Sequence, residues 1–176
     1  MSIATTNTLE NTTAPKPEAG PSAITLANLQ SAFKTKCDPW IGIEIEAMIV
    51  DAVSGQPVDG FHAVYDQLSA PIQSRTCQEF LNSQIEHVTT PSVAPGHHRR
   101  EISEFVQEAI AAAAQIDACL LWSGSHPTWQ FDRNLVSDCQ RSHQNVARYG
   151  DRATAFATCS MHCHVQVPQD LSLIHI

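Results

Sequence analysis

The most regular hydrophobic pattern in the chain is an alternation of apolar and polar positions over residues 40–50. It predicts a strand with three isoleucines on one face and Gly42, Glu44 and Glu46 on the other. Shorter or less regular patterns predict further strands at 80–89, 118–123 and 153–167.

Helical spacing of apolar residues is clearest over residues 98–119, where an apolar stripe passes through an alanine-rich segment. Weaker helical patterns are predicted at 22–34, 62–68 and 135–149. Strands and helices therefore alternate irregularly, which predicts an α+β fold with helices packed on one side of a sheet. A chain of 176 residues is long enough for one domain with a proper core.

The two ends of the chain differ from this pattern. Residues 1–21 hold too few apolar side chains to offset the entropy of ordering, so we interpret them as a disordered leader and 22–170 as the folded domain. The last six residues, LSLIHI at 171–176, resemble the translation of a transposase end sequence used in DNA library preparation. We interpret them as a sequencing-adapter artefact, which implies a C-terminally truncated domain. The alternative is an apolar C-terminal strand.

Charge and composition exclude several classes of function. Eighteen acidic and ten basic residues give a net charge of −8 without a basic cluster, so we expect no nucleic-acid partner. No apolar run reaches the roughly 18–20 residues that span a bilayer, and the N-terminus lacks a secretory signal pattern. We therefore expect a cytoplasmic protein with no membrane partner, whose six cysteines, none in a CxxC pair, are buried free thiols.

Acidic side chains recur at strand positions. Glu44 and Glu46 project from one face of the first strand about 7 Å apart, which favours a divalent cation such as Mg²⁺ that prefers carboxylate oxygens. The alternative is the solvated face of an edge strand. Glu86 within the second strand, Glu79 at its entrance and His162 in the last strand extend the candidate metal set over three strands.

Other polar residues near the last strand leave alternatives open. His164 shares a face with His162, but a lone histidine is more often a satisfied core or surface residue. The CSMHCH segment at 159–164 raises the question of zinc, although Cys163 would point away from both histidines. The HxH pair itself is compatible with zinc or another transition metal.

The loop GSHP at 124–127 is either a simple turn or a place where His126 donates a hydrogen bond to a phosphate or carboxylate. Arg141 and Arg148 share one face of the helix predicted at 135–149, where they either bind an anionic substrate or form a solvated face. The sequence contains no Walker loop and no dinucleotide fingerprint.

Four segments occur in an order that resembles the glutamate–cysteine ligase family of carboxylate–amine ligases. They are IGIEIEAMIVD at 41–51, NSQIEHVTTP at 82–91, GSHP at 124–127 and MHCHVQV at 161–167. The resemblance implies a glutamine synthetase-like catalytic fold with a largely antiparallel sheet. It also implies ATP and Mg²⁺ as cofactors, with glutamate and an amino acid such as cysteine as substrates.

By this resemblance the candidate metal ligands are Glu44, Glu46, Glu79, Glu86 and His162, and the candidate catalytic residues are His126 and Arg141. Two departures concern the substrate contacts: Gln166 replaces a common glycine, and Gln140-Arg141-Ser142 replaces a common Glu-Arg-Tyr. They leave the acceptor amine open.

We expect an ATP-dependent ligase that forms γ-glutamylcysteine or a related amide through an acyl phosphate. The alternatives are a non-catalytic metal- or nucleotide-binding domain and an inactive fragment whose cut sheet exposes an unpaired edge. A homo-oligomer is compatible with the sequence.

Overall fold

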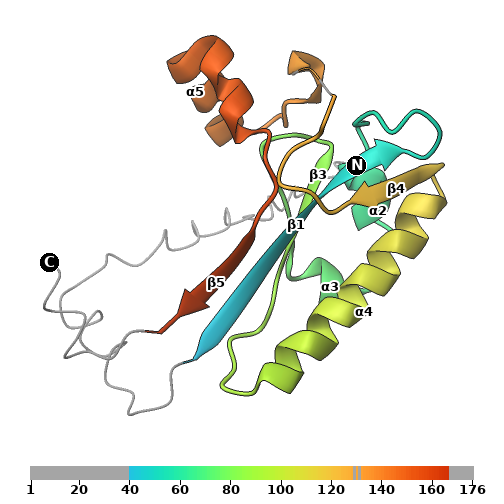
Figure 1. Cartoon of the computed structure of the whole chain (residues 1–176), viewed down its shortest axis with the longest axis vertical. Helices are drawn as coiled ribbons and strands as arrows, with labels where there is room; N and C mark the ends of the chain where they lie inside the picture. The colour runs from blue at the N-terminus through green and yellow to red at the C-terminus, as the bar shows by residue number, and fades with distance from the viewer. Residues whose placement is uncertain (1–39, 129, 131, 167–176) are drawn as a thin grey trace, which may run out of the picture. The chain divides into compact units, whose positions relative to one another are not determined.

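The computed structural model describes residues 40–128, 130 and 132–166 of the chain. Within them, five strands form one antiparallel sheet (Figure 1): β1 (Ile41–Asp51), β2 (Thr76–Gln78), β3 (Gln84–Val88), β4 (Ala118–Leu121) and β5 (Met161–Val165). The predicted leader, the helix predicted at 22–34 and the LSLIHI segment lie outside the described residues.

β1 is the centre of the sheet because it is the longest strand and contacts three others. β3 pairs with residues 44–48 of β1 and also with β2. β5 pairs with residues 41–45 of β1, and β4 with residues 48–51. The β1 residues that pair with β4 and with β5 overlap those that pair with β3. Because β3 occupies one edge of β1, β4 and β5 must lie end to end along the other edge. The sheet is therefore split beside Glu46 and Ala47, between β4 and β5.

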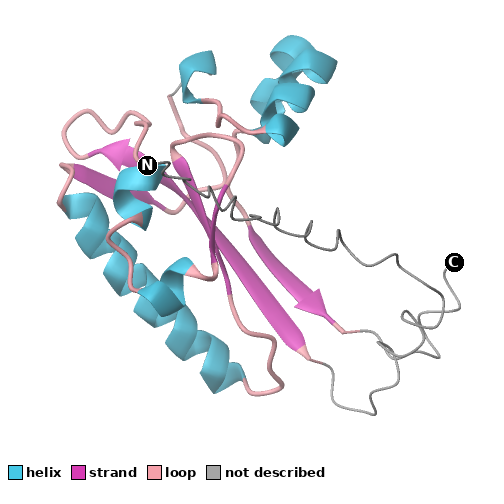
Figure 2. Cartoon of the chain, turned by 180° about the vertical axis from the view of Figure 1, so that it is seen from behind, coloured by secondary structure: helices cyan, strands magenta, loops and turns pink. Residues whose placement is uncertain are grey.

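The helices cover the isoleucine face of the sheet. Ile45, Ala47 and Ile49 of β1 are buried in the main core, together with Phe105 and Ala109 of α4 (Pro95–Ala114). The short helices α2 (Phe61–Tyr65) and α3 (Ala70–Gln73) add buried residues to the same core. Figure 2 shows α4 running along one side of the sheet. The prediction of an antiparallel α+β sheet with helices on one side is confirmed.

Several predicted boundaries were wrong. The helix predicted at 98–119 ends at Ala114, because the backbone turns at Asp117, whose φ is +53°, and then enters β4. The strand predicted at 80–89 begins only at Gln84, because residues 81–83 form a bridge and a turn. The helix α3 and the strand β2 were not predicted.

The C-terminal half of the described chain differs most from the prediction. The helix predicted at 135–149 is divided into η1 (Arg133–Leu135) and α5 (Gln140–Tyr149). The strand predicted at 153–167 consists of the 3-10 helix η2 (Gly150–Phe156), a linker and the short β5. Ala153 and Ala157 pack with Phe80 and Leu81 in a second core cluster, so tertiary contacts override the local strand pattern.

The thiols are less buried than expected. Of the five cysteines in the described residues, all are free, but only Cys159 is buried, whereas Cys77, Cys119, Cys139 and Cys163 are exposed. The prediction failed at Cys163 because every residue of β5 is exposed. None of the described helices combines the length and the apolar character needed to cross a membrane.

The buried His87 of β3 generates a testable pH dependence. Its ring stacks on Phe105 with 4.4 Å between the ring centroids, and its Nδ1 lies 3.1 Å from Oγ1 of Thr76. Burial lowers the pKa of His87 from 6.5 to about 4. Because the unfolded chain binds more protons between these values, stability should fall as the pH drops from 6.5 toward 4. We expect His87→Phe to lose less stability than the wild type over this range. The measurement is the thermal unfolding midpoint of each protein between pH 7 and 4.5.

The matched control is His62→Phe, because His62 is exposed on α2. It should keep the wild-type pH dependence. An equally steep loss of stability in His87→Phe and in the wild type would contradict the assignment of this acid sensitivity to His87.

Candidate active site

The face of the sheet opposite the helices gathers the predicted carboxylates. In the β1–β3 register Glu46 stands directly opposite Glu86, and in the β1–β5 register Glu44 stands opposite His162. Directly paired residues of antiparallel strands project from the same face. Glu44, Glu46, Glu86 and His162 therefore share one face of three adjacent strands, as the period-two pattern predicted.

The histidines of β5 contact two carboxylates of this acidic face. His162 Nδ1 lies 3.2 Å from Oε2 of Glu44 and 3.5 Å from Oε1 of Glu46. His164 Nε2 lies 3.1 Å from Oε1 of Glu44, so Glu44 has a histidine at each of its oxygens. His164 is thus part of the acidic site, although the sequence did not distinguish it from an ordinary surface histidine.

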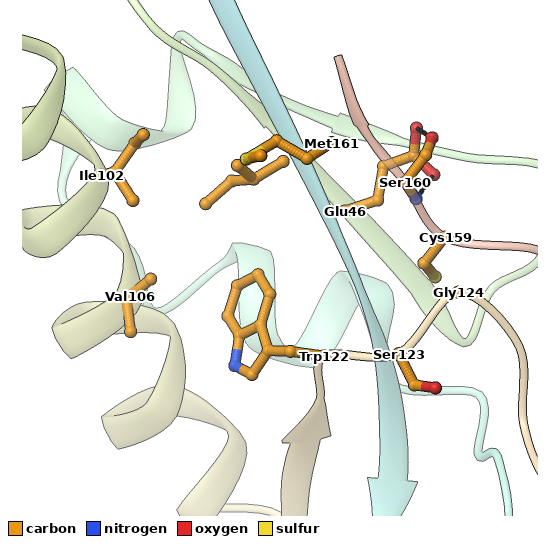
Figure 3. A pocket seen from close by; sticks show the side chains of 10 residues that line it. Glu46, Ile102, Val106, Trp122, Ser123, Gly124, Cys159, Ser160 and Met161 are labelled. Atoms are coloured by element: carbon orange, nitrogen blue, oxygen red, sulfur yellow. Dashed lines mark hydrogen bonds between the residues drawn. The ribbon is translucent and has the colours of Figure 1, made fainter. Parts of the chain in front are cut away.

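Glu46 is held by the residue that precedes β5. Its side chain is only 9% exposed, and its two oxygens accept hydrogen bonds from the backbone N–H and the hydroxyl of Ser160, at 2.9 and 3.0 Å. Figure 3 shows the Glu46 carboxylate turned toward Ser160, away from Ile102 and Val106 of α4. These residues line one pocket of about 370 Å³, whose lining includes Glu46, Ser160, Ile102, Val106, Trp122 and Met161.

Glu79 and Glu86 form a second, differently compensated pair. Glu79 follows β2, and its carboxyl group is hydrogen bonded to that of Glu86. That bond, burial and the charges of Glu79, Glu44 and Glu46 raise the pKa of Glu86 to about 8. At neutral pH the proton is therefore shared within the Glu86–Glu79 pair. Arg141 of α5 lies 3.4 Å from Oε2 of Glu79, with its side chain 74% exposed, so it also reaches this site.

The GSHP loop contacts a different part of the structure. His126 Nε2 lies 2.7 Å from the carbonyl oxygen of Gly55, in the turn after β1, and donates to it. Its Nδ1 accepts from the backbone N–H of Thr128 at 3.3 Å. At the start of the loop, the carbonyl oxygen of Gly124 accepts from the N–H of Cys159, next to Ser160. The loop thus braces the segment beside Glu46, while a contact of His126 with substrate stays a prediction.

This arrangement of strands and carboxylates coincides with a match to known proteins. The sequence profile described as "Glutamate-cysteine ligase family 2" matches residues 40–175, which is most of the chain. The chain belongs to this family. The resemblance inferred from the four motifs is thereby confirmed.

Relatives and solved structures agree with this membership. The chain is 30% identical over 128 residues to a protein of Salinispora arenicola whose provisional name is glutamate–cysteine ligase 2, covering 73% of the chain and 34% of that protein. A Bordetella parapertussis protein with the same provisional name is 26% identical over 140 residues, covering 79% and 34%. The chain therefore spans about a third of the length of the curated relatives that it matches.

Two crystal structures share the fold. The bifunctional glutathione synthetase of Pasteurella multocida superposes with a TM-score of 0.58 at 20% identity, covering 78% of this chain and 18% of that one. The glutamate–cysteine ligase of Francisella tularensis, determined in complex with AMP, gives 0.53 at 16% identity, covering 79% and 29%. At these identities the likeness concerns the fold alone.

The carboxylates suit a magnesium ion by their chemistry but are not arranged around one. In the residues that the structure describes, no three His, Cys, Asp or Glu side chains converge on a point that could hold a metal. Glu44 faces the histidines, Glu46 faces Ser160 and Glu86 shares a proton with Glu79. Cys163 pairs with Ile43 and so lies on the face opposite His162, which argues against convergence of the CSMHCH segment. The ligand roles of the family candidates stay predictions.

Sequence reasoning missed two residues that shape this site. Ser160 and Gln84 reach it through contacts between segments 114 and 74 residues apart in the chain. For Gln84 a signal existed, because it precedes Glu86 by two residues on β3 and therefore shares its face. For Ser160 the available signal was weak: a serine two residues before a histidine in a predicted strand.

The raised pKa of Glu86 predicts that Glu86→Gln stabilises the metal-free protein at alkaline pH. Between about 4.5 and 8 the folded state binds more protons than the unfolded state, so this group's contribution to stability is lost as the pH rises through 8. Glutamine preserves the shape and the donor of the protonated acid. In EDTA, the thermal unfolding midpoint of Glu86→Gln should exceed that of the wild type at pH 8.5 and approach it at pH 5.

Glu104→Gln is the matched control, because Glu104 is exposed on α4. It should follow the wild type at both pH values. If Glu86→Gln and Glu104→Gln behaved alike, the crowding of carboxylates around Glu86 would not be a significant source of instability.

Proposed function

We propose that this protein is an ATP-dependent ligase that joins the γ-carboxylate of glutamate to the amine of another amino acid, with cysteine as the first acceptor to test. The carboxylate face formed by Glu44, Glu46 and Glu86, in a chain of the glutamate–cysteine ligase family, carries the proposal. The match to structures of two ligases of related chemistry supports it at the level of the fold.

The proposed reaction has two steps. An oxygen of the glutamate γ-carboxylate attacks the terminal phosphorus of ATP, which releases ADP and leaves γ-glutamyl phosphate. The acceptor amine then attacks the γ-carbonyl carbon, phosphate departs with the electrons of the C–O bond, and the nitrogen loses a proton to give the amide. Both steps gather negative charge, so they require compensating cations.

Magnesium is the cation that this set of donors suits by its chemistry. Glu44, Glu46 and Glu86 supply carboxylate oxygens, the ligand type that Mg²⁺ prefers, and Glu79 and His162 flank them. When bound, Mg²⁺ would neutralise charge on the phosphoryl group in transfer. To hold it, Glu86 would release the proton that it shares with Glu79, and Glu44 would turn from its histidines.

Arg141 and His126 are the proposed contacts to anionic groups. Arg141 is mostly exposed, and among the described residues its guanidinium has one long contact, to Glu79. The guanidinium can therefore turn to a phosphate or carboxylate at the edge of the acidic face. His126 would act from the GSHP loop after exchanging its bond to Gly55. Gln166 and Ser142 occupy positions where the family pattern differs, which leaves acceptor amines other than cysteine to be tested alongside it.

The proposal predicts that Glu46→Gln abolishes Mg²⁺-dependent ADP formation by the full-length gene product in the presence of glutamate and cysteine. Loss of one carboxylate from a site that compensates phosphoryl charge should reduce the rate by about 100-fold or more. Glu86→Gln should act in the same direction. The measurement is a coupled assay of ADP release, with mass spectrometry of the amide product.

Glu104→Gln serves again as the control and should retain the wild-type rate. ADP formation that persists in both Glu46→Gln and Glu86→Gln would remove the metal assignment. Binding of ATP and metal by the wild type without turnover, for glutamate with any amino acid as acceptor, would instead favour a binding domain.

A further inference from the structure

In the part of the chain that the structure describes, Glu46 is the one carboxylate of the acidic face that the main chain clamps. Glu46 and Ser160 exchange three hydrogen bonds: Glu46 N–H donates to the Ser160 carbonyl at 3.0 Å, and the N–H and hydroxyl of Ser160 donate to the two oxygens of Glu46. A carboxylate held at both oxygens loses its rotational freedom. Because each oxygen still has a second lone pair, the clamp leaves Glu46 able to bind a cation.

Ser160 is itself fixed from two directions. Gln84, which is fully buried in β3, donates from Nε2 to the carbonyl oxygen of Thr158 at 2.7 Å. Its Oε1 accepts from the N–H of Leu81 at 3.0 Å, so the amide cannot rotate without losing both bonds. The N–H of Cys159 donates to the Gly124 carbonyl oxygen at 3.1 Å. The two residues before Ser160 are therefore tied to β3 and to the GSHP loop.

The hydroxyl of Ser160 also connects Glu46 with His162. Its oxygen lies 3.0 Å from Oε1 of Glu46 and 3.1 Å from Nε2 of His162. Since the single hydroxyl proton is donated to the carboxylate, the lone pairs of the oxygen remain to accept from the ring. One hydroxyl thus sets the direction of a candidate ligand on β1 and of another on β5.

We propose that Ser160 is a positioning residue for the cation site, restricting the orientations of Glu46 and His162 on the acidic face without binding the ion itself. This inference rests on the proposed function, because it presumes the divalent cation there. Ser160 lies in the split between β4 and β5, where no neighbouring strand supplies these bonds. There the N–H of Ser160 bonds the Glu46 side chain instead of the β1 backbone, and its hydroxyl bonds the same carboxylate.

The test measures cation binding directly, with Mn²⁺ as a spectroscopic substitute for Mg²⁺ in electron paramagnetic resonance titrations of the full chain. Ser160→Ala removes the hydroxyl but keeps the N–H bond to Glu46. It should raise the Kd for Mn²⁺ about tenfold, because a Glu46 carboxylate released from the hydroxyl must be ordered again when it binds the ion. Ser160→Thr keeps the hydroxyl, and its β-branch suits extended backbone at this exposed position, so it should restore wild-type affinity.

Two further measurements separate positioning from general stability. The thermal unfolding midpoint of Ser160→Ala should equal that of Ser103→Ala, which removes a hydroxyl from exposed α4. In the ligase assay, Ser160→Ala should raise the Mg²⁺ concentration needed for half-maximal rate more than it lowers the rate at saturating Mg²⁺.

The outcomes distinguish this inference from the proposed function. Mn²⁺ binding that is lost in Glu46→Gln but unchanged in Ser160→Ala would overturn the positioning role alone. A failure of the wild type to bind Mn²⁺ would overturn the metal site and the inference with it. Weaker binding in Ser160→Ala and Ser160→Thr alike, with lowered unfolding midpoints, would show that Ser160 is merely structural and would also overturn the inference.

Discussion

The register of β1 with its neighbours is the constraint on which the rest of this structure depends. Ile45, Ala47 and Ile49 are buried against α4, so the alternate residues of β1 must face the other side. A shift of one residue would place Glu44 and Glu46 in the core. Burial of the isoleucine face therefore fixes the acidic face, and the pairing of Glu46 with Glu86 follows from the same register.

This constraint brings like charges together, and the chain compensates them in three ways. Glu44 is paired with two histidines, Glu46 accepts hydrogen bonds from Ser160, and Glu86 keeps a proton against Glu79. Each solution uses a different neighbouring segment: β5, the linker before it, and the end of β2. Each carboxylate of the acidic face therefore has a partner without a cation, and a bound cation could replace that partner.

The sequence predicted an element correctly where a strong local hydrophobic pattern agreed with the packing of that element in the fold. The alternation in β1 and the apolar stripe of α4 predicted both elements and their buried faces, because each packs against the other. The prediction failed at 153–167, where small residues such as Ala153 fit a second core with Phe80 and the chain turns before β5. It also failed for Cys163, because the pattern shows that β5 is a strand but not that it lies exposed at the edge. Four of the five candidate metal ligands could be placed on strands by period, but Ser160 could not, since its role arises from a split in the sheet.

That split accounts for the Ser160 contacts of Glu46 and so for its difference from the other two carboxylates. Glu44 would have to leave its histidines to bind a cation, and Glu86 would have to lose a proton whose pKa lies near 8. Ser160 already holds Glu46, whose Oε1 also lies 3.5 Å from His162 Nδ1. The second lone pair of Oε2 is therefore the one that could meet a cation without rearrangement. A cation approaching this face should therefore engage Glu46 first, and its charge would then favour ionisation of Glu86 on the directly paired strand. On this argument the order of ligand recruitment follows from the backbone, through the one carboxylate that the main chain holds.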